Sequence, residues 1–205
     1  MFTAKFPKWP LVLAASFLLA GCANFLSSNV VTFHEGPLPM GESIRVEPMD
    51  ASKAGSLEFR SYARLIAEQL RKLGYTPVES PDSDVQLIAE VDYDIVLGPT
   101  DVRVERDMSY VRYHFYYGRF ADPFYFGIDN NWDPEIYAVT NYERSLRMNI
   151  VRASGDRERL FEGRVQSVGR QNNLPGIMPY LITAMFANFP GESGVTKVVT
   201  IEMDE

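Results

Sequence analysis

Residues 84–97 read Asp84-Val85-Gln86-Leu87-Ile88-Ala89-Glu90-Val91-Asp92-Tyr93-Asp94-Ile95-Val96-Leu97. Every odd position is apolar or aromatic, and the polar residues that follow Val85 fall on even positions: Gln86, Glu90, Asp92 and Asp94. A period of two is that of a strand whose side chains point alternately to its two faces. The stretch therefore predicts a strand with one buried face, which Gly98-Pro99 is expected to end.

Weaker versions of this alternation occur elsewhere in the chain. They predict strands over residues 44–49, 75–78, 102–117, 137–152, 160–169 and 195–203. Ser154-Gly155-Asp156 has the composition of a tight turn, so the strands on either side of it are expected to form a hairpin. Short turns between successive strands force antiparallel neighbours.

Two segments show the 3.6-residue period of a helix with one apolar face. The first covers residues 57–73, with Ser56 placed to cap its start and Gly74 placed to end it. The second covers residues 174–189, with Asn173 as its N-cap. Each helix must bury its apolar stripe against another element.

The elements follow the order β-α-β, then a run of strands, then α-β. We therefore predict an α+β fold, a two-layer sandwich with a mostly antiparallel sheet and two helices packed on one face. Residues 43–205 are expected to form this single domain, whose size is normal for one core. Residues 1–21 are assigned to a signal peptide, and residues 22–42 to a lipidated N-terminus and tether.

The start of the chain has the pattern of a bacterial lipoprotein signal. Lys5 and Lys8 precede an apolar run over residues 11–20, which is too short to span a bilayer. The run ends in Leu19-Ala20-Gly21-Cys22, which closely resembles a lipobox. Small residues let the peptidase accept the backbone, and the cysteine thiolate takes the diacylglyceryl group. We therefore predict cleavage before Cys22 and attachment to a membrane through lipid on its sulfur.

The resemblance to lipoproteins also implies a location. An Asp directly after the lipidated cysteine commonly retains such proteins in the inner membrane, but Ala23 stands there in this chain. In a Gram-negative host this implies the outer membrane, with the domain facing the periplasm. Ala23 to Gly36 is small, polar and weakly patterned, and is therefore expected to be a tether between lipid and domain.

Composition excludes several classes of function. Cys22 is the only cysteine, so a lipidated chain has no disulfide, thiolate metal site or catalytic thiol. The formal net charge is −7, and removal of Lys5 and Lys8 makes the mature chain more acidic still. Proteins that bind nucleic acid carry a basic footprint, so no nucleic-acid partner is expected.

Four segments resemble those of a bacterial lipoprotein family, domain of unknown function 4136. They are Gln69 to Tyr75 at the end of the first helix, Asp84 to Ala89 in the best strand, Phe161 to Gly163 in the late hairpin, and Ala187 to Pro190 after the last helix. The likeness extends from about Ile44 to Met203. It implies no activity and no catalytic residues.

An aromatic insert that departs from this family pattern is the candidate interaction surface. Aromatic rings offer a large contact area at small entropic cost, and tyrosine is a usual anchor of interfaces. The alternative, that the rings pack locally on the sheet, stays open. The candidate residues are Tyr110, Tyr113, Tyr116, Tyr117, Phe120, Phe124, Tyr125, Phe126 and Trp132.

No catalytic residue, metal site or cofactor is predicted. Asp129 to Glu135 places oxygen atoms at alternate positions, but Pro134 stands where a calcium loop needs glycine, which favours a plain turn. The two histidines, His34 and His114, have no second ligand in view.

The three carboxylates of the best strand could hold a cation or share a proton. Charged residues mostly stay exposed, so a solvated strand face is favoured. Glu90, Asp92 and Asp94 are then expected to face solvent, with Arg103 or Arg106 as candidate ion-pair partners.

Three functions fit these features. The first is a non-enzymatic envelope lipoprotein that binds a protein partner or assists envelope assembly. The second is a module that binds a small molecule such as a glycan, a peptidoglycan fragment or a lipid. The third is an envelope hydrolase, for which no catalytic set is visible.

The lipobox predicts a specific covalent product. Mass spectrometry of the mature protein should show an N-terminal cysteine carrying acyl chains at Cys22, and a Cys22→Ser variant should keep its leader. An intact leader in the wild type, or an unmodified thiol, would contradict the assignment.

Overall fold

The computed structural model describes residues 24–80, 83–105 and 135–204. The strands are β1 (Asn24–His34), β2 (Ser43–Pro48), β3 (Thr76–Pro77), β4 (Leu87–Glu105), β5 (Glu135–Arg152), β6 (Arg159–Gly169) and β7 (Thr196–Met203). The helices are the short 3-10 helix η2 (Ala51–Lys53) and the α-helices α2 (Leu57–Lys72) and α3 (Leu174–Phe186).

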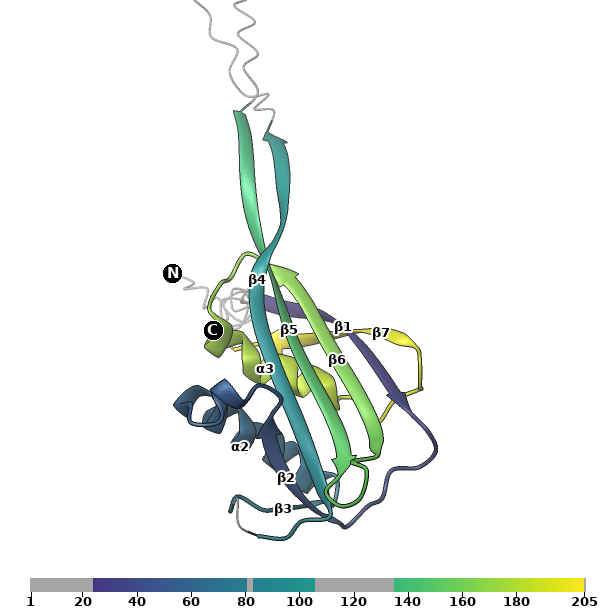
Figure 1. The fold of residues 1–205 in the computed structure, drawn as a ribbon. Coiled ribbons are helices and arrows are strands. Elements are labelled where there is room, and N and C mark those ends of the chain that lie inside the picture. Colours follow the sequence, from purple (N-terminus) through teal and green to yellow (C-terminus); the bar gives the residue numbers. More distant parts are fainter. Residues whose placement is uncertain (1–23, 81–82, 106–134, 205) are drawn as a thin grey trace, which may run out of the picture.

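The strands form one seven-stranded sheet in the order β3-β2-β4-β5-β6-β1-β7 (Figure 1). Strand β2 runs parallel to both of its neighbours, β3 and β4. The other four pairs, β4–β5, β5–β6, β6–β1 and β1–β7, are antiparallel. The sheet is thus mixed, and it is curled into a half-barrel. The predicted two-layer sandwich with a mostly antiparallel sheet is therefore wrong, although the α+β class holds.

Two physical causes separate this sheet from the predicted one. Alternation of apolar residues predicts which face of a strand is buried, but it does not predict which strand pairs with it or in which direction. Because α2 connects β2 to β3, the chain crosses over before it pairs, and such a connection makes the two strands parallel. Neighbouring strands also rotate by roughly 20–25° each, so a sheet with this many strands curls around its helices.

Strand β1 occupies the segment that was expected to be a tether. It lies inside the sheet, between β6 and β7, with Val30 opposite Val165 on one side and Lys197 on the other. The tether prediction for Ala23 to Gly36 is therefore wrong between Asn24 and His34. The described sheet thus includes residues 24–34, which precede the predicted domain of residues 43–205.

The alternation of β1 is hidden because polar side chains fill inward positions. Ser28 and Thr32 are buried on the same face of the strand as Val30. Phe33 is exposed on the opposite face. Hydropathy alone therefore gives no period of two, although the backbone pairs with β7 over residues 24–31 and with β6 over residues 29–34.

Strand β4 continues through Gly98-Pro99, where the sequence predicted its end. A register shift between Leu97 and Thr100 accommodates the pair, and Pro99 needs no ladder bond on its outer edge because β2 pairs with β4 only as far as Val91. The prediction of a separate strand over residues 102–117 is wrong at its start, since residues 102–105 continue β4. Its remainder lies outside the described residues.

Both predicted helices are confirmed at their starts. Ser56 accepts a hydrogen bond from the backbone N–H of Phe59, and Asn173 accepts one from Gly176. Gly74 has a φ of +95°, the left-handed conformation that ends α2. The α-helix α3 ends at Phe186, earlier than predicted, because the next N–H bonds three residues back to Ala184.

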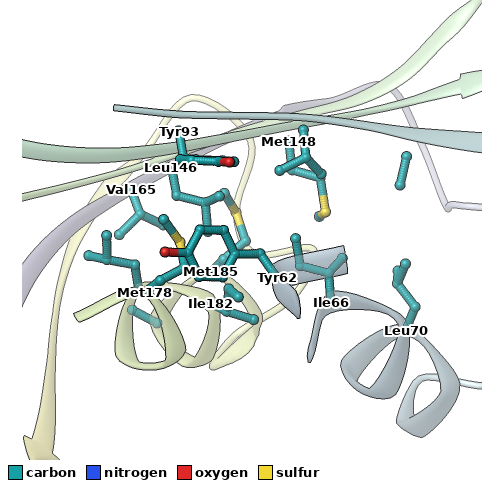
Figure 2. Packing of buried hydrophobic residues seen from close by; sticks show 14 of the residues in the cluster. Tyr62, Ile66, Leu70, Tyr93, Leu146, Met148, Val165, Met178, Ile182 and Met185 are labelled. Carbon is teal, nitrogen blue, oxygen red and sulfur yellow. The ribbon is translucent and has the colours of Figure 1, made fainter. Parts of the chain in front are cut away.

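The core lies between the sheet and the two helices, which pack on the same face (Figure 2). The helices contribute Tyr62, Ile66, Leu70, Met178, Ile182 and Met185, and the sheet contributes Tyr93, Leu146, Met148 and Val165. Tyr62 meets Tyr93 edge-on at 4.9 Å between ring centroids. Its hydroxyl donates to Glu58 at 2.8 Å, and burial raises the pKa of Tyr62 above its ordinary range.

Neither α2 nor α3, the α-helices of the described residues, is long and apolar enough to cross a membrane.

The position of β1 predicts how a small substitution affects stability. Val30 is 8 % exposed, so Val30→Ala should lower the free energy of unfolding by about 2 kcal/mol through lost methyl burial and a cavity. Val198 on the neighbouring strand β7 is 71 % exposed, so Val198→Ala should change the free energy of unfolding by less than about 0.5 kcal/mol. Equal effects in chemical denaturation would contradict the placement of β1.

Candidate interaction surface

A two-stranded ribbon projects from one end of the sheet (Figure 1). Strands β4 and β5 pair from Thr100 and Thr140 to Glu105 and Glu135, beyond the point where β6 ends at Gly169. The ribbon consists of six residue pairs and extends about 17 Å at the usual rise of a strand. A lone two-stranded ribbon is marginally stable in water, and edges that no other described strand pairs with can accept another chain.

The base of the ribbon is closely packed. A Cβ atom at Gly98 would lie 3.2 Å from the backbone nitrogen of Glu143 and 3.3 Å from the carbonyl oxygen of Asn141. The side-chain amide of Asn141 donates to the carbonyl of Pro99 at 3.1 Å. The glycine and this hydrogen bond hold the register shift at which the sheet narrows to the ribbon.

Four apolar side chains are exposed near the end of the sheet from which the ribbon projects, three on its helix-free face and one, Leu97, on the opposite face. They are Phe25, Val96, Leu97 and Val168. Val96 and Val168 lie on either side of Glu143 in one row of the sheet. Strand β1 runs antiparallel to β6, so Phe25 at its start lies at the end of the sheet where β6 finishes. Leu97 is 74 % exposed and Phe25 is 60 % exposed.

A buried guanidinium lies directly below this end, on the helix-facing side of the sheet. Arg144 is only 2 % exposed, and its Nη2 donates to the hydroxyl of Ser167 at 3.3 Å. Its Nε has no hydrogen-bond partner in the described part of the chain, and neither does the hydroxyl of Ser28. Ser167 in turn donates to the carbonyl of Ser27 at 2.8 Å.

The position of Arg144 is costly for the fold. Burial lowers the pKa of its guanidinium, because a low dielectric disfavours the charged form. No ion pair to Arg144 is found within the described ranges. A Cβ at Gly169 would lie 2.6 Å from Nη2 of Arg144, so the glycine leaves the space that the guanidinium fills. The sequence shows this residue at an inward position of β5, where its neighbours on that face are apolar.

The three carboxylates of β4 form a solvated face, as the sequence favoured. Asp92 accepts a hydrogen bond from Lys53 at 2.8 Å and lies 3.6 Å from Arg147, while Glu90 lies 2.9 Å from Arg157. Asp94 accepts a hydrogen bond from the backbone N–H of Ile95. The side chains of Arg103 and Arg106, the predicted partners, lie outside the described residues. Within the described residues no group of three metal-ligating side chains gathers.

Shallow hollows are present on both faces of the sheet. One lies among Val31, Phe33 and Arg164 on the helix-free face and has a volume of about 60 Å³. Another lies near Thr32 and Asn188 and has a volume of about 20 Å³. Sites for small molecules typically enclose 300–1,000 Å³, so these hollows hold a few water molecules at most.

His34 has a structural role at the far end of β1. Its ring nitrogens lie 3.1 Å from the carbonyl oxygen of Gly36 and 3.2 Å from that of Gly191. Its backbone N–H donates to the hydroxyl of Ser193 at 3.0 Å. These contacts join β1 to the loop between α3 and β7.

Several predicted site residues lie outside the described residues. They are the lipidation residue Cys22, His114, Pro134, and the surface residues Tyr110, Tyr113, Tyr116, Tyr117, Phe120, Phe124, Tyr125, Phe126 and Trp132. Of the segment weighed as a calcium loop, only Glu135 is described, as the first residue of β5. The ribbon is the element that carries the insert in sequence.

One family profile, "Domain of unknown function (DUF4136)", matches residues 33–191. Among curated proteins no relative matches the chain.

Solved structures are similar to this chain at low sequence identity. A PDZ domain protein from Parabacteroides distasonis is similar with a TM-score of 0.50 and 11 % identity, over 95 % of this chain and 43 % of that one. The chain thus spans less than half of that protein. Two dodecamers of PelC from Paraburkholderia phytofirmans score 0.41 (10 % identity, 81 % of this chain, 99 % of that one) and 0.37 (12 % identity, 76 % of this chain, 91 % of that one).

The unpaired guanidinium predicts an unusual response to mutation. Arg144→Met should raise the free energy of unfolding by about 1–3 kcal/mol, because an uncompensated buried charge is replaced by an apolar chain of similar length. Arg147 is half-exposed and lies 3.6 Å from Asp92. Arg147→Met should therefore change the free energy of unfolding by less than about 0.5 kcal/mol. If chemical denaturation shows that Arg144→Met destabilises the domain, the charge is compensated in the protein.

Proposed function

This chain belongs to the DUF4136 family, a domain of unknown function, and on that premise we propose that it is a lipid-anchored envelope protein that binds a protein partner. We propose further that lipid on Cys22 holds it on the outer membrane of a Gram-negative host, facing the periplasm. It acts by contact, without catalysis of its own.

The observation that carries this proposal is the projecting ribbon. A two-stranded ribbon has little stability of its own, so its presence favours a role in contact with another molecule. The edges of the arm offer unpaired backbone groups for β-augmentation, in which a partner strand adds to the sheet.

The composition of the insert, which joins β4 to β5 in the sequence, supports the same role. It contains the nine aromatic residues of the predicted surface, together with Arg112 and Arg119. Tyrosine, tryptophan and arginine are the residues most enriched at the energetic centres of protein interfaces. A glycan or lipid ligand is less favoured, since the hollows at Val31 and Thr32 are too small for either.

A comparison of captured proteins tests this role. Intact cells expressing the wild type, or a Tyr116→Ala plus Phe124→Ala variant, are cross-linked and the protein is purified with its partners. The variant should lose the specific partner by at least about tenfold, because loss of two anchor rings costs more than 1.4 kcal/mol.

Phe33→Ala provides a matched control, since Phe33 is an exposed aromatic at the opposite end of the sheet. It should retain the partner. If both variants capture the same proteins as the wild type, the insert is not the interface. A rise in melting temperature with a glycan or peptidoglycan fragment would instead support the small-molecule role.

A further inference from the structure

The exposed side of α2 is basic, although the chain as a whole has a formal net charge of −7. Its two carboxylates are Glu58, which accepts a hydrogen bond from the hydroxyl of Tyr62, and Glu68. None of the ion pairs found in the described part of the chain lies on this helix. The helix has four basic side chains, all exposed: Arg60, Arg64, Arg71 and Lys72.

Helix α3 adds no negative charge to this side of the molecule. It contacts α2, both helices pack on one face of the sheet (Figure 2), and its thirteen residues include no charged side chain. Leu57, the first residue of α2, is 75 % exposed. The exposed residues of α3 are small or uncharged: Pro175, Gly176, Pro179 and Thr183.

The helix-free face of the sheet has the opposite character. Two of its arginines, Arg45 and Arg147, lie in ion pairs with Glu47 and Asp92. The pairing registers place many carboxylates on this face, namely Glu47, Glu90, Asp92, Asp94, Glu143, Glu162 and Glu202. The domain is therefore polarised, with unpaired cations over the helices and an excess of carboxylates on the other face of the sheet.

The proposed lipidation site would lie close to α3. Cys22 precedes Asn24 by two positions, and two residues span at most about 7 Å. Asn24 pairs with Met203 of β7, and the backbone N–H of the next residue, Asp204, donates to the hydroxyl of Tyr180 on α3 at 3.0 Å. Lipid on Cys22 would therefore hold α3, and α2 beside it, near the surface of the bilayer.

Charge decides which face such a domain turns to an anionic bilayer. Anionic headgroups attract lysine and arginine and repel carboxylates over about 10 Å at ordinary salt. The helix side is attracted and the helix-free face is repelled. A helix with exposed basic residues and an exposed leucine is typical of segments that lie on a membrane. The ribbon extends from β4 and β5 and not from the helices (Figure 1), so it does not cover α2.

We propose that the exposed side of α2 is a docking surface for anionic phospholipid headgroups, and that it turns the acidic face of the sheet toward water. This inference rests on the proposed lipidation of Cys22. An acidic protein would offer the same charge, but the phospholipid surface is favoured because the anchor brings the helices to it.

Single-cysteine labelling can measure which face turns to the membrane, because Cys22 is the only native cysteine and is blocked when acylated. The full lipidated protein, carrying Glu68→Cys or Asp94→Cys, is labelled with a fluorophore. It is reconstituted into vesicles of phosphatidylcholine and phosphatidylglycerol that contain a headgroup-nitroxide quencher. The two variants are matched, since each removes one exposed carboxylate, from α2 or from the helix-free face. Ser61→Cys, also exposed on α2, keeps every charge of the helix and replaces Glu68→Cys if that variant does not fold.

We expect the label at position 68 to be quenched at least about twofold more than the label at position 94, because the charges of α2 hold it at the headgroups. Addition of Arg64→Gln should lower the ratio of docked to undocked domain about fivefold, the effect of one basic side chain at an anionic surface. Arg164→Gln is the matched control, since Arg164 is an exposed arginine on the helix-free face, and it should leave the quenching unchanged.

Three results would overturn the inference while the proposed function stands. They are equal or stronger quenching at position 94 in acylated protein, a difference that persists in vesicles of phosphatidylcholine alone, and cross-links from position 61 to an acidic protein without quenching. The last would assign the surface to a protein partner. Absence of acyl chains on Cys22 by mass spectrometry would instead refute the lipid-anchored function, and the inference with it.

Discussion

The structure depends on the insertion of β1 between β6 and β7. Without β1, β7 has no strand to pair with, and the inward face loses Leu26 and Val30 from the core under α3. The same insertion fixes where the N-terminal segment leaves the domain. A segment that lies in the middle of a sheet cannot act as a tether.

Much of the element order could be predicted from the sequence, because alternation and helical period are local. Both helices begin at their predicted caps, Ser56 and Asn173. The parallel placement of β2 could not be predicted, since a pattern of burial contains no information on pairing direction. Strand β1 escaped detection because Ser28 and Thr32 take inward positions. The passage of β4 through Gly98-Pro99 depends on a free strand edge, which only the assembled sheet reveals.

The candidate surface was predictable only in part. The aromatic insert and the lipobox are visible as composition and motif, whereas the place of β1 in the sheet and the projection of the ribbon follow from the register of the strands. Arg144 was not predicted to be buried, although it shares its face of β5 with Tyr142, Leu146 and Met148. Its burial near the base of the ribbon, next to the space left by Gly169, depends on the folded sheet. The proposed contact with membrane and partner thus combines chemistry read from the chain with positions set by the fold.

The account stands on β1 being a permanent part of the sheet. Amide hydrogen exchange of the intact protein tests this most directly, because ladder hydrogen bonds slow exchange and a tether has none. The amides of Asn29 to Phe33 should be protected to the same degree as those of their partners in β6. Exchange of these amides at the rate of an unstructured peptide, with β6 still protected, would contradict the central claim.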